Sequence, residues 1–325
     1  MPKCAYACYN KNEEVRMSSS SGGIYSLLAE KILEDGGEVF AACYDRNLEV
    51  SYRKINSIDE LPDSRGSKYV ASHMGNVFQD VLDSLQKGIK VLFVGTPCQC
   101  EGLMSFLGKR YDNLVCVDFI CHGIPGRIPW RKYLESMKNR GSELVGINMR
   151  DKTSGWSKGK FCWKMTDNFG NTTFQPQSEN FFMKGFIANI YLRPSCYNCQ
   201  FKGIERKTDF TLGDYWGVWN IQPEMDDNKG ISLVLVHSQK GQKLFDSVSS
   251  SIVYTNAFLD KAIKYNSPIL SSVKCSDNRK VFYKRINEGE DFIKIIEDLT
   301  RISFKDKLKI RIKRSIKKIF KIFNY

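Results

Sequence analysis

The sequence predicts an α/β fold: a central mixed, largely parallel sheet with flanking helices, a strand-rich second half and a basic C-terminal helix. Three observations support this prediction. Short runs of β-branched and aromatic residues, typical of buried strands, alternate with segments of helical period over residues 23–141. Strand-like segments dominate from Glu143 onwards. Lys and Arg are concentrated in residues 301–325.

Each element of the first half has its own signal. Residues 23–35 show an amphipathic helical pattern that Gly36 and Gly37 close, and residues 75–88 show a second one. Residues 58–70 predict a loop or a short helix. The predicted strands are residues 38–45, 91–99 and 114–120, and the other predicted helices are residues 100–108 and 127–141.

The second half predicts shorter strands joined by turns. Residues 168–171, Asn-Phe-Gly-Asn, predict a turn between two strands. A helical stretch at 179–192 precedes a Cys-x-x-Cys loop, and the chain from about Asn256 is helical and increasingly charged. The predicted strands are residues 145–151, 160–167, 172–177, 208–218 and 231–238, followed by a helix at 239–250.

The composition indicates a cytoplasmic protein. The chain has 325 residues, of which 42% are hydrophobic, enough for a sizeable core. Its eleven cysteines are not preceded by an apolar signal segment, which argues against a disulfide scaffold. No stretch reaches the length of a transmembrane helix. We therefore expect a reducing compartment.

The net charge of +13 belongs mostly to the tail. Residues 301–325 hold ten Lys or Arg and one Asp, which leaves a net charge of +4 on the first 300 residues. An enzyme acting on nucleic acid would be expected to spread basic residues around its cleft. The charge distribution therefore argues against a nucleic-acid partner.

Four cysteines are predicted to meet in space. Cys98 and Cys121 each come at the end of a predicted buried strand, and Cys196 and Cys199 form a Cys-x-x-Cys loop. Ligand sites in open α/β sheets gather at the carboxyl ends of the strands. Four thiolates suit a four-iron cluster or a zinc ion. The alternatives are inert core cysteines at the strand ends and a redox pair in the loop.

Three polar segments predict loops that contact a cofactor. Residues 18–23, Ser-Ser-Ser-Ser-Gly-Gly, precede a helix and would cradle an anion, although a plain serine N-cap explains one of these residues. Residues 65–69 combine Gly, Ser, Lys and Tyr, with an exposed turn as the alternative. Residues 95–97 join a strand to a helix, a place for phosphate. Asp209 and Asp214 either bond a ribose or ring nitrogen or cap a turn.

These segments together resemble the beta-subunit family of coenzyme F420 hydrogenases and dehydrogenases. The resemblance covers roughly residues 5–250 and rests on SSSGG, RGSKY, GTPCQ, DFICHG, RPSCYNCQFK and TDFTLGDYWG, in that order. It implies FAD and a [4Fe-4S] cluster, with electrons passing between cluster, flavin and a deazaflavin or other acceptor. It implies as cluster ligands Cys98, Cys121, Cys196 and Cys199. It implies as flavin contacts Ser20, Ser21, Gly22, Gly66, Ser67, Lys68, Gly95 and Thr96.

We expect the chain to divide into three parts. Residues 1–85 would be an N-terminal part that contacts the flavin, residues 86–255 would bind cluster and flavin, and residues 256–325 would be a helical extension with a basic amphipathic tail. His122, next to a ligand cysteine, is expected to make a hydrogen bond to the cluster, and no catalytic acid or base is assigned.

The chain departs from the family at its N-terminus. Many relatives begin with a ferredoxin module of closely spaced cysteines, whereas here only Cys4 and Cys8 precede the serine segment, at a spacing that completes no cluster site. We therefore expect an electron-donor or electron-acceptor protein as partner, and use of coenzyme F420 stays open. The other cysteines are expected to be structural: Cys43, Cys100, Cys116, Cys162 and Cys275.

This short layout resembles family members linked to polysaccharide biosynthesis, which suggests a sugar or glycan precursor as substrate. The competing hypothesis is a zinc-stabilised, non-redox binding or scaffold protein of a membrane-associated polysaccharide assembly system.

The basic tail predicts an amphipathic helix. Its apolar residues recur at helical spacing among Lys and Arg: Leu308, Ile312, Ile316, Ile319 and Phe323. Such a helix can lie in an anionic membrane surface, which would make the protein peripheral on the inner face of the cytoplasmic membrane. The alternative is a terminal helix that packs its apolar stripe on the body.

Overall fold

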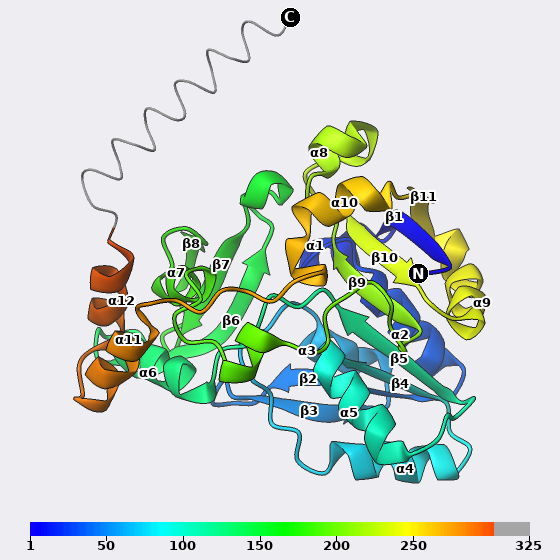
Figure 1. Ribbon diagram of the computed structural model, residues 1–325, viewed down its shortest axis with the longest axis horizontal. Coiled ribbons are helices and arrows are strands. Elements are labelled where there is room, and N and C mark those ends of the chain that lie inside the picture. The colour runs from blue at the N-terminus through cyan, green and yellow to red at the C-terminus, as the bar shows by residue number, and fades with distance from the viewer. Residues whose placement is uncertain (302–325) are drawn as a thin grey trace, which may run out of the picture.

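A computed structural model describes residues 1–301 of the chain, so the predicted tail helix lies outside the described residues. Its centre is an eight-stranded mixed sheet with the order β11-β1-β10-β9-β5-β4-β2-β3 (Figure 1). The strands of this sheet are β1 (Cys4–Asn10), β2 (Glu38–Tyr44), β3 (Val50–Ile55), β4 (Val91–Gly95), β5 (Leu114–Phe119), β9 (Phe210–Asp214), β10 (Ser232–Val236) and β11 (Ile252–Asn256).

The predicted α/β class and mixed sheet are confirmed. The parallel pairs lie in the middle of the sheet, where β4 pairs with β2 and β5, and β5 pairs with β9. The outer pairs, β2–β3, β9–β10, β10–β1 and β1–β11, are antiparallel. The two strands followed by predicted ligand cysteines, β4 and β5, thus lie in the middle of the parallel part.

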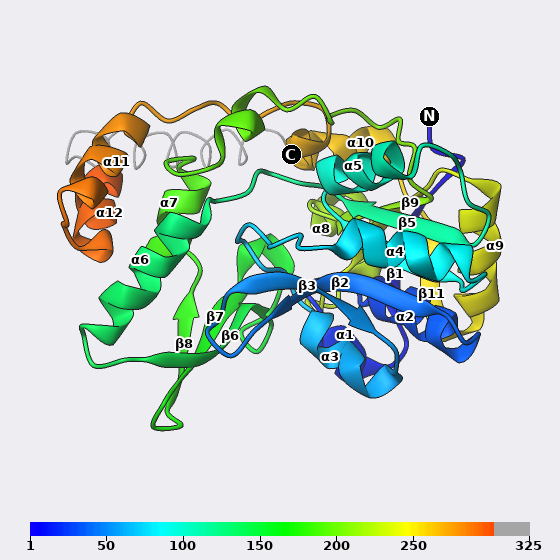
Figure 2. The same cartoon turned by 90° about the horizontal axis from the view of Figure 1, so that it is seen from below.

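Helices cover both faces of this sheet (Figure 2). On one face, α2 (Ile24–Glu34) and α9 (Gln239–Val248) share a core with β5 and β10 through Leu28, Phe245, Val117 and Val234. On the other face, α4 (Val77–Gln86) and α5 (Pro97–Leu107) pack on Phe93 and Cys116. Both layers form because each helix has an apolar stripe that the strands' β-branched side chains bury.

A second, smaller body lies beside the main sheet (Figure 1). It contains the antiparallel sheet β6 (Leu144–Asp151), β7 (Cys162–Asp167) and β8 (Thr172–Pro176), with α6 (Arg127–Lys138), α7 (Phe181–Ile187), α11 (Arg279–Asn287) and α12 (Phe292–Thr300). Its core is aromatic, with buried Trp130, Tyr133, Trp163, Phe182 and Phe292. Large rings supply much buried area per residue, which suits so small a sheet.

The remaining elements are short. They are α1 (Glu13–Ser18), η1 (Ile58–Glu60), α3 (Leu61–Ser64), η2 (Ser157–Gly159), η3 (Pro194–Asn198), α8 (Val218–Ile221), η4 (Pro223–Met225), η5 (Ser249–Ser251), α10 (Leu259–Tyr265) and η6 (Ser267–Ile269). Among residues 1–301, none of the helices has the length and apolarity needed to span a bilayer.

Several elements differ from the prediction. The strands β1, β3 and β11 and the helix α1 have no counterpart in it, and the helix predicted for 179–192 ends at Ile187. β3 is an edge strand whose Arg53 and Lys54 face solvent, so its sequence lacks an apolar run. The helix predicted for 100–108 begins at Pro97, which places Cys98 in its first turn.

Candidate functional site

Cys98 lies where β4 gives way to α5. Thr96 is the N-cap of the helix and forms a capping box with Gln99, and Pro97 takes the first helical position. The Thr96 hydroxyl contacts the Cys98 sulfur at 3.1 Å. The cap holds Cys98 exposed at the edge of the sheet.

Cys121 lies two residues beyond the end of β5, and its segment packs tightly on the Cys-x-x-Cys loop. A Cβ on Gly123 would come within 2.8 Å of Leu192 and 3.4 Å of the Cys196 Cβ, so only glycine allows this approach. The Ile124 amide donates to the Cys196 sulfur at 3.4 Å. Strand end and loop are thereby held in contact.

The Cys-x-x-Cys loop is fixed from its other side as well. The Cys199 amide donates to the Ser272 hydroxyl at 2.9 Å. The Lys202 ammonium donates to the Cys121 carbonyl at 2.6 Å and to the Pro268 carbonyl at 2.7 Å. Three segments far apart in sequence therefore converge at the cysteines.

The four predicted ligands share one electrostatic environment. Burial raises the pKa of the Cys121 thiol to about 12, the Lys202 cation opposes this rise, and negative charge on Cys196, Cys98 and Cys199 adds to it. Burial likewise raises the pKa of Cys196, with further contributions from Cys98 and Cys199. Negative charge on Cys98 and Cys199 therefore acts on the thiols of both Cys121 and Cys196.

The thiols converge without forming a metal site in the described structure. Over residues 1–301, no group of three or more His, Cys, Asp or Glu side chains has the arrangement that holds a metal ion. The donor set itself consists of four thiols, one exposed and three half-buried, which is the chemistry that iron–sulfur centres use.

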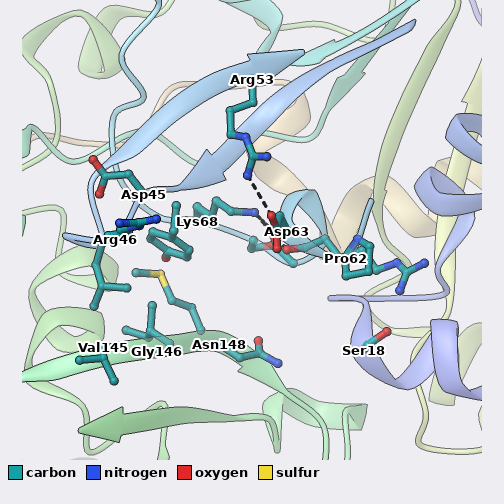
Figure 3. A pocket seen from close by; sticks show the side chains of 17 residues that line it. Ser18, Asp45, Arg46, Arg53, Pro62, Asp63, Lys68, Val145, Gly146 and Asn148 are labelled. Carbon is teal, nitrogen blue, oxygen red and sulfur yellow. Dashed lines mark hydrogen bonds and ion pairs between the residues drawn. The ribbon is translucent and has the colours of Figure 1, made fainter. Parts of the chain in front are cut away.

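A cavity of about 690 Å³ lies between α3 and β6 (Figure 3). Three of the predicted flavin contacts, Gly66, Ser67 and Lys68, line it. Gly66 has φ of +81° and open space around its Cα, so its backbone is accessible from the cavity. Val145, Gly146 and Asn148 of β6 form the opposite wall in Figure 3.

The Lys68 ammonium makes its hydrogen bonds within the loop that follows α3. It donates to the carbonyls of Ser64 and Arg65 at 3.1 and 3.0 Å, and to that of Gly66 at 3.4 Å. Burial lowers the pKa of Lys68 to about 8. The amine thus closes the end of α3 and fixes the conformation of Gly66 and Ser67 at the cavity wall.

The predicted serine contacts divide into two sets. The Ser20 hydroxyl accepts from the amide of Ser67 at 2.6 Å, which joins the serine segment to the cavity loop. The Ser21 hydroxyl instead donates to the Ile231 carbonyl, and the Gly22 amide donates to the Ser232 hydroxyl. Ser21 and Gly22 therefore secure the segment against β10.

Gly95 and Thr96 lie at the cysteine edge and not at the cavity. A Cβ on Gly95 would come within 2.6 Å of the Tyr52 hydroxyl, so this glycine is required by packing inside the protein. Thr96 is buried and occupied by its capping box.

The two candidate aspartates make internal bonds. Asp209 accepts from the Cys116 amide and from the Ser238 hydroxyl. Asp214 forms a bidentate pair with Arg150, at 2.9 and 3.1 Å. Sequence reasoning missed Arg150, because its partner lies 64 residues away along the chain.

Arg150 and Lys152 organise the serine segment. Arg150 also donates to the Tyr69 hydroxyl and the Ser20 carbonyl. Lys152 donates to the carbonyls of Arg16 and Ser21, while burial lowers its pKa to about 7. Both side chains come from the end of β6, so this strand carries the polar groups that hold the segment.

The cavity loop and the cysteine segment run side by side. The Ala71 amide donates to the Pro125 carbonyl at 3.2 Å. The His122 ring lies 5.0 Å from that of Phe186, which lies 4.9 Å from that of Tyr69. His122 Nε2 contacts Asn189 Oδ1 at 2.7 Å, and burial lowers the pKa of this imidazole. An aromatic contact chain thus links the two regions.

Comparisons with known proteins agree with this arrangement. No curated protein is significantly similar in sequence to the chain. The fold is similar to a chain in a xenon-derivatised structure of the F420-reducing [NiFe] hydrogenase complex from Methanosarcina barkeri. That similarity has 16% identity and a TM-score of 0.56, over 89% of this chain and 94% of that one. Residues 5–79 match the N-terminal model, and residues 88–261 the C-terminal model, of the coenzyme F420 hydrogenase/dehydrogenase beta subunit. The chain therefore belongs to the coenzyme F420 hydrogenase/dehydrogenase beta-subunit family.

Proposed function

We propose that the chain is an iron–sulfur flavoprotein oxidoreductase that holds one four-iron cluster and FAD. Its family consists of hydrogenase and dehydrogenase subunits, which makes oxidoreductase the class of activity. The observation that supports the proposal is the packing of the Cys121 segment on the Cys-x-x-Cys loop, where the Ile124 amide donates to the Cys196 sulfur and Lys202 donates to the Cys121 carbonyl. Cys98, in the first turn of α5 after the neighbouring strand β4, is the proposed fourth ligand.

The donor chemistry fits a cluster. Thiolates are the ligands of four-iron clusters, and the Cys-x-x-Cys loop offers two of them from one turn. The packing at Gly123 and the Lys202 contacts bring the Cys121 carbonyl and the loop together before any metal binds. In the proposed site these contacts orient the ligands.

The cavity between α3 and β6 is the proposed flavin site. Gly66 and Ser67 offer backbone that a planar ring or a phosphate can approach, and Arg46 supplies positive charge among the lining residues. Flavin supplies the ability to take up two electrons and to release them singly, as a cluster requires. The chain's part is to hold Ser67 through Ser20 and to fix the loop through Lys68.

The contacts between Ala71 and Pro125 support a short path between the two proposed sites. The rings of His122, Phe186 and Tyr69, which are in contact, form the proposed connection between them. An electron-donor or electron-acceptor protein is the proposed partner. Coenzyme F420 appears in the name of the family and of the hydrogenase neighbour, and a deazaflavin is a proposed acceptor.

The finer assignments stay proposals that rest on the sequence alone. They are a sugar or glycan precursor as substrate, the three-part division at residues 85 and 255, and peripheral binding to an anionic membrane through residues 301–325.

The test is the spectrum and metal content of the full-length protein purified without oxygen. The proposal expects a brown protein with flavin absorbance, iron and acid-labile sulfide. A colourless protein that contains zinc would instead favour the zinc-stabilised, non-redox binding protein.

A further inference from the structure

A lysine joins two of the segments that meet at the cysteines. Lys202 lies three residues after Cys199 and is half-buried. Its ammonium donates to the Cys121 carbonyl at 2.6 Å and to the Pro268 carbonyl at 2.7 Å. An ammonium has three N–H bonds, so these two contacts leave one N–H that makes no hydrogen bond within the described residues.

Lys202 differs from the other cations of its segment in its charge partners. Arg206 pairs with Asp118, and Lys207 pairs with Glu101 at 2.7 Å. Among the ion pairs formed within residues 1–301, none includes Lys202. Its positive charge acts on two adjacent groups: it opposes the rise in the pKa of the Cys121 thiol, and it adds to the lowering of the pKa of the His122 imidazole.

The second carbonyl that holds Lys202 belongs to residues 267–279, here called the strap, which joins α10 to α11 (Figure 2). The strap lies beyond residues 88–261, the range matched by the C-terminal family model. It contacts the cysteine loop at two further points, where the Gly203 amide donates to the Ile269 carbonyl at 2.7 Å and the Cys199 amide to Ser272. These bonds fix the position of the ammonium relative to Cys121 and Cys199.

We propose that Lys202 is a positioning residue that compensates the charge of the cluster and raises its reduction potential. The inference rests on the proposed cluster. A cluster with four thiolate ligands is negatively charged, and its reduction adds one further electron. A fixed cation beside it stabilises the reduced form more than the oxidised form. The bond to the Cys121 carbonyl places that cation beside a ligand residue, and the bond to Pro268 makes its position depend on the strap.

The experiment is a potentiometric titration of the full-length protein, purified without oxygen, with dithionite as the reductant. The absorbance of the cluster is the readout. Lys202→Met removes the charge and both hydrogen bonds, and its midpoint potential should shift to more negative values. Lys202→Arg keeps the charge, so its midpoint potential should lie close to that of the parent. Lys207→Met is the matched control, because it removes a cation of the same segment that already pairs with Glu101. It should leave the potential unchanged.

A second variant guards against loss of the cluster. If Lys202→Met does not retain iron, the potential is measured on Lys202→Gln instead, because glutamine keeps an N–H donor and lacks the charge. Retention of iron in Lys202→Arg alone also supports the charge role. An unchanged potential in the Met or Gln variant overturns the inference, as does loss of iron from the Arg, Gln and Met variants alike. Absence of iron and sulfide from the unaltered protein overturns the proposed function instead, so the two failures are distinguishable.

Discussion

A buried carboxyl group lies beneath the cysteine edge. Asp118, in β5, is 1% exposed and accepts hydrogen bonds from the hydroxyls of Thr208 and Thr211. The Arg206 guanidinium lies 3.7 Å away. Burial raises the pKa of Asp118 to about 6, against the opposing effects of the hydroxyls and Arg206. The fold therefore holds this carboxyl in its neutral form under conditions that ionise it in the unfolded chain.

This difference predicts a pH dependence of stability. The unfolded chain releases the Asp118 proton near the ordinary pKa of 3.8 and the folded chain near 6, so the parent loses stability as pH rises through that window. Asp118→Asn cannot ionise and should gain up to about 3 kcal/mol relative to the parent across the same window. Urea unfolding of the full-length protein at several pH values measures this, with exposed Asp112→Asn as the control. Parallel pH profiles for parent and Asp118→Asn would contradict it.

At the scale of elements, the cysteine positions depend on how helices begin and end. The start of α5 could have been read from the sequence, because Thr96 and Pro97 are good residues for an N-cap and a first helical position. The buried strands and amphipathic helices were predictable from their periodicity. By contrast, β1 consists mainly of Ala, Cys and Tyr and contains no β-branched residue, so it lacks the signal that marked the other buried strands. The Arg150–Asp214 pair depends on the tertiary fold and gives no local signal.

The capping box of α5 should contribute to the stability of the fold, so we expect a change at Thr96 to lower the free energy of unfolding. Thr96 is buried, and its hydroxyl and amide both contact the Gln99 side chain. Thr96→Ala should lower the free energy of unfolding by about 1 kcal/mol, while Thr96→Ser should keep most of it. Chemical denaturation measures both variants. Equal stabilities for the Ala and Ser variants would show that the cap contributes little.

The loop after α3 predicts an effect on flavin. Lys68→Ala removes the ammonium that holds the carbonyls of Ser64 to Gly66, so the cavity wall should loosen and flavin retention should fall. Iron content should stay at the parental level, because Lys68 makes no contact with the cysteine segments. Flavin content after gel filtration is the readout, with exposed Lys160→Ala as the control. Parental flavin affinity in Lys68→Ala would argue against this cavity as the flavin site.

At the scale of the whole molecule, the cysteine edge lies where the main sheet, the smaller body and the strap meet (Figure 1). The motifs alone supplied the candidate ligand set, because strand ends and a Cys-x-x-Cys loop are local signals, and that set stays a prediction. The strap was not predictable, since residues 267–279 contain no such motif. Its role depends on hydrogen bonds between segments about 70 residues apart, such as Cys199 to Ser272.

The basic tail gives a prediction that concerns the whole chain. Deleting residues 301–325 should abolish sedimentation with anionic vesicles at low salt and leave iron and flavin content intact, because juxtamembrane cations contribute on the order of 1 kcal/mol each near such a surface. Neutral vesicles are the control. The full-length protein could fail to sediment, or the truncated protein could unfold. Either result would indicate that the tail packs on the folded body and does not bind the membrane.

The most direct test of the central claim is the iron and acid-labile sulfide content of the full-length protein and its single cysteine variants, all purified without oxygen. Four iron and four sulfide per chain are expected for the parent. Each of Cys98→Ser, Cys121→Ser, Cys196→Ser and Cys199→Ser should lose most of both, whereas Cys275→Ser, which alters an exposed cysteine outside the set, should keep them. Unchanged iron in all four variants would contradict the assignment of these cysteines as the ligands of one cluster.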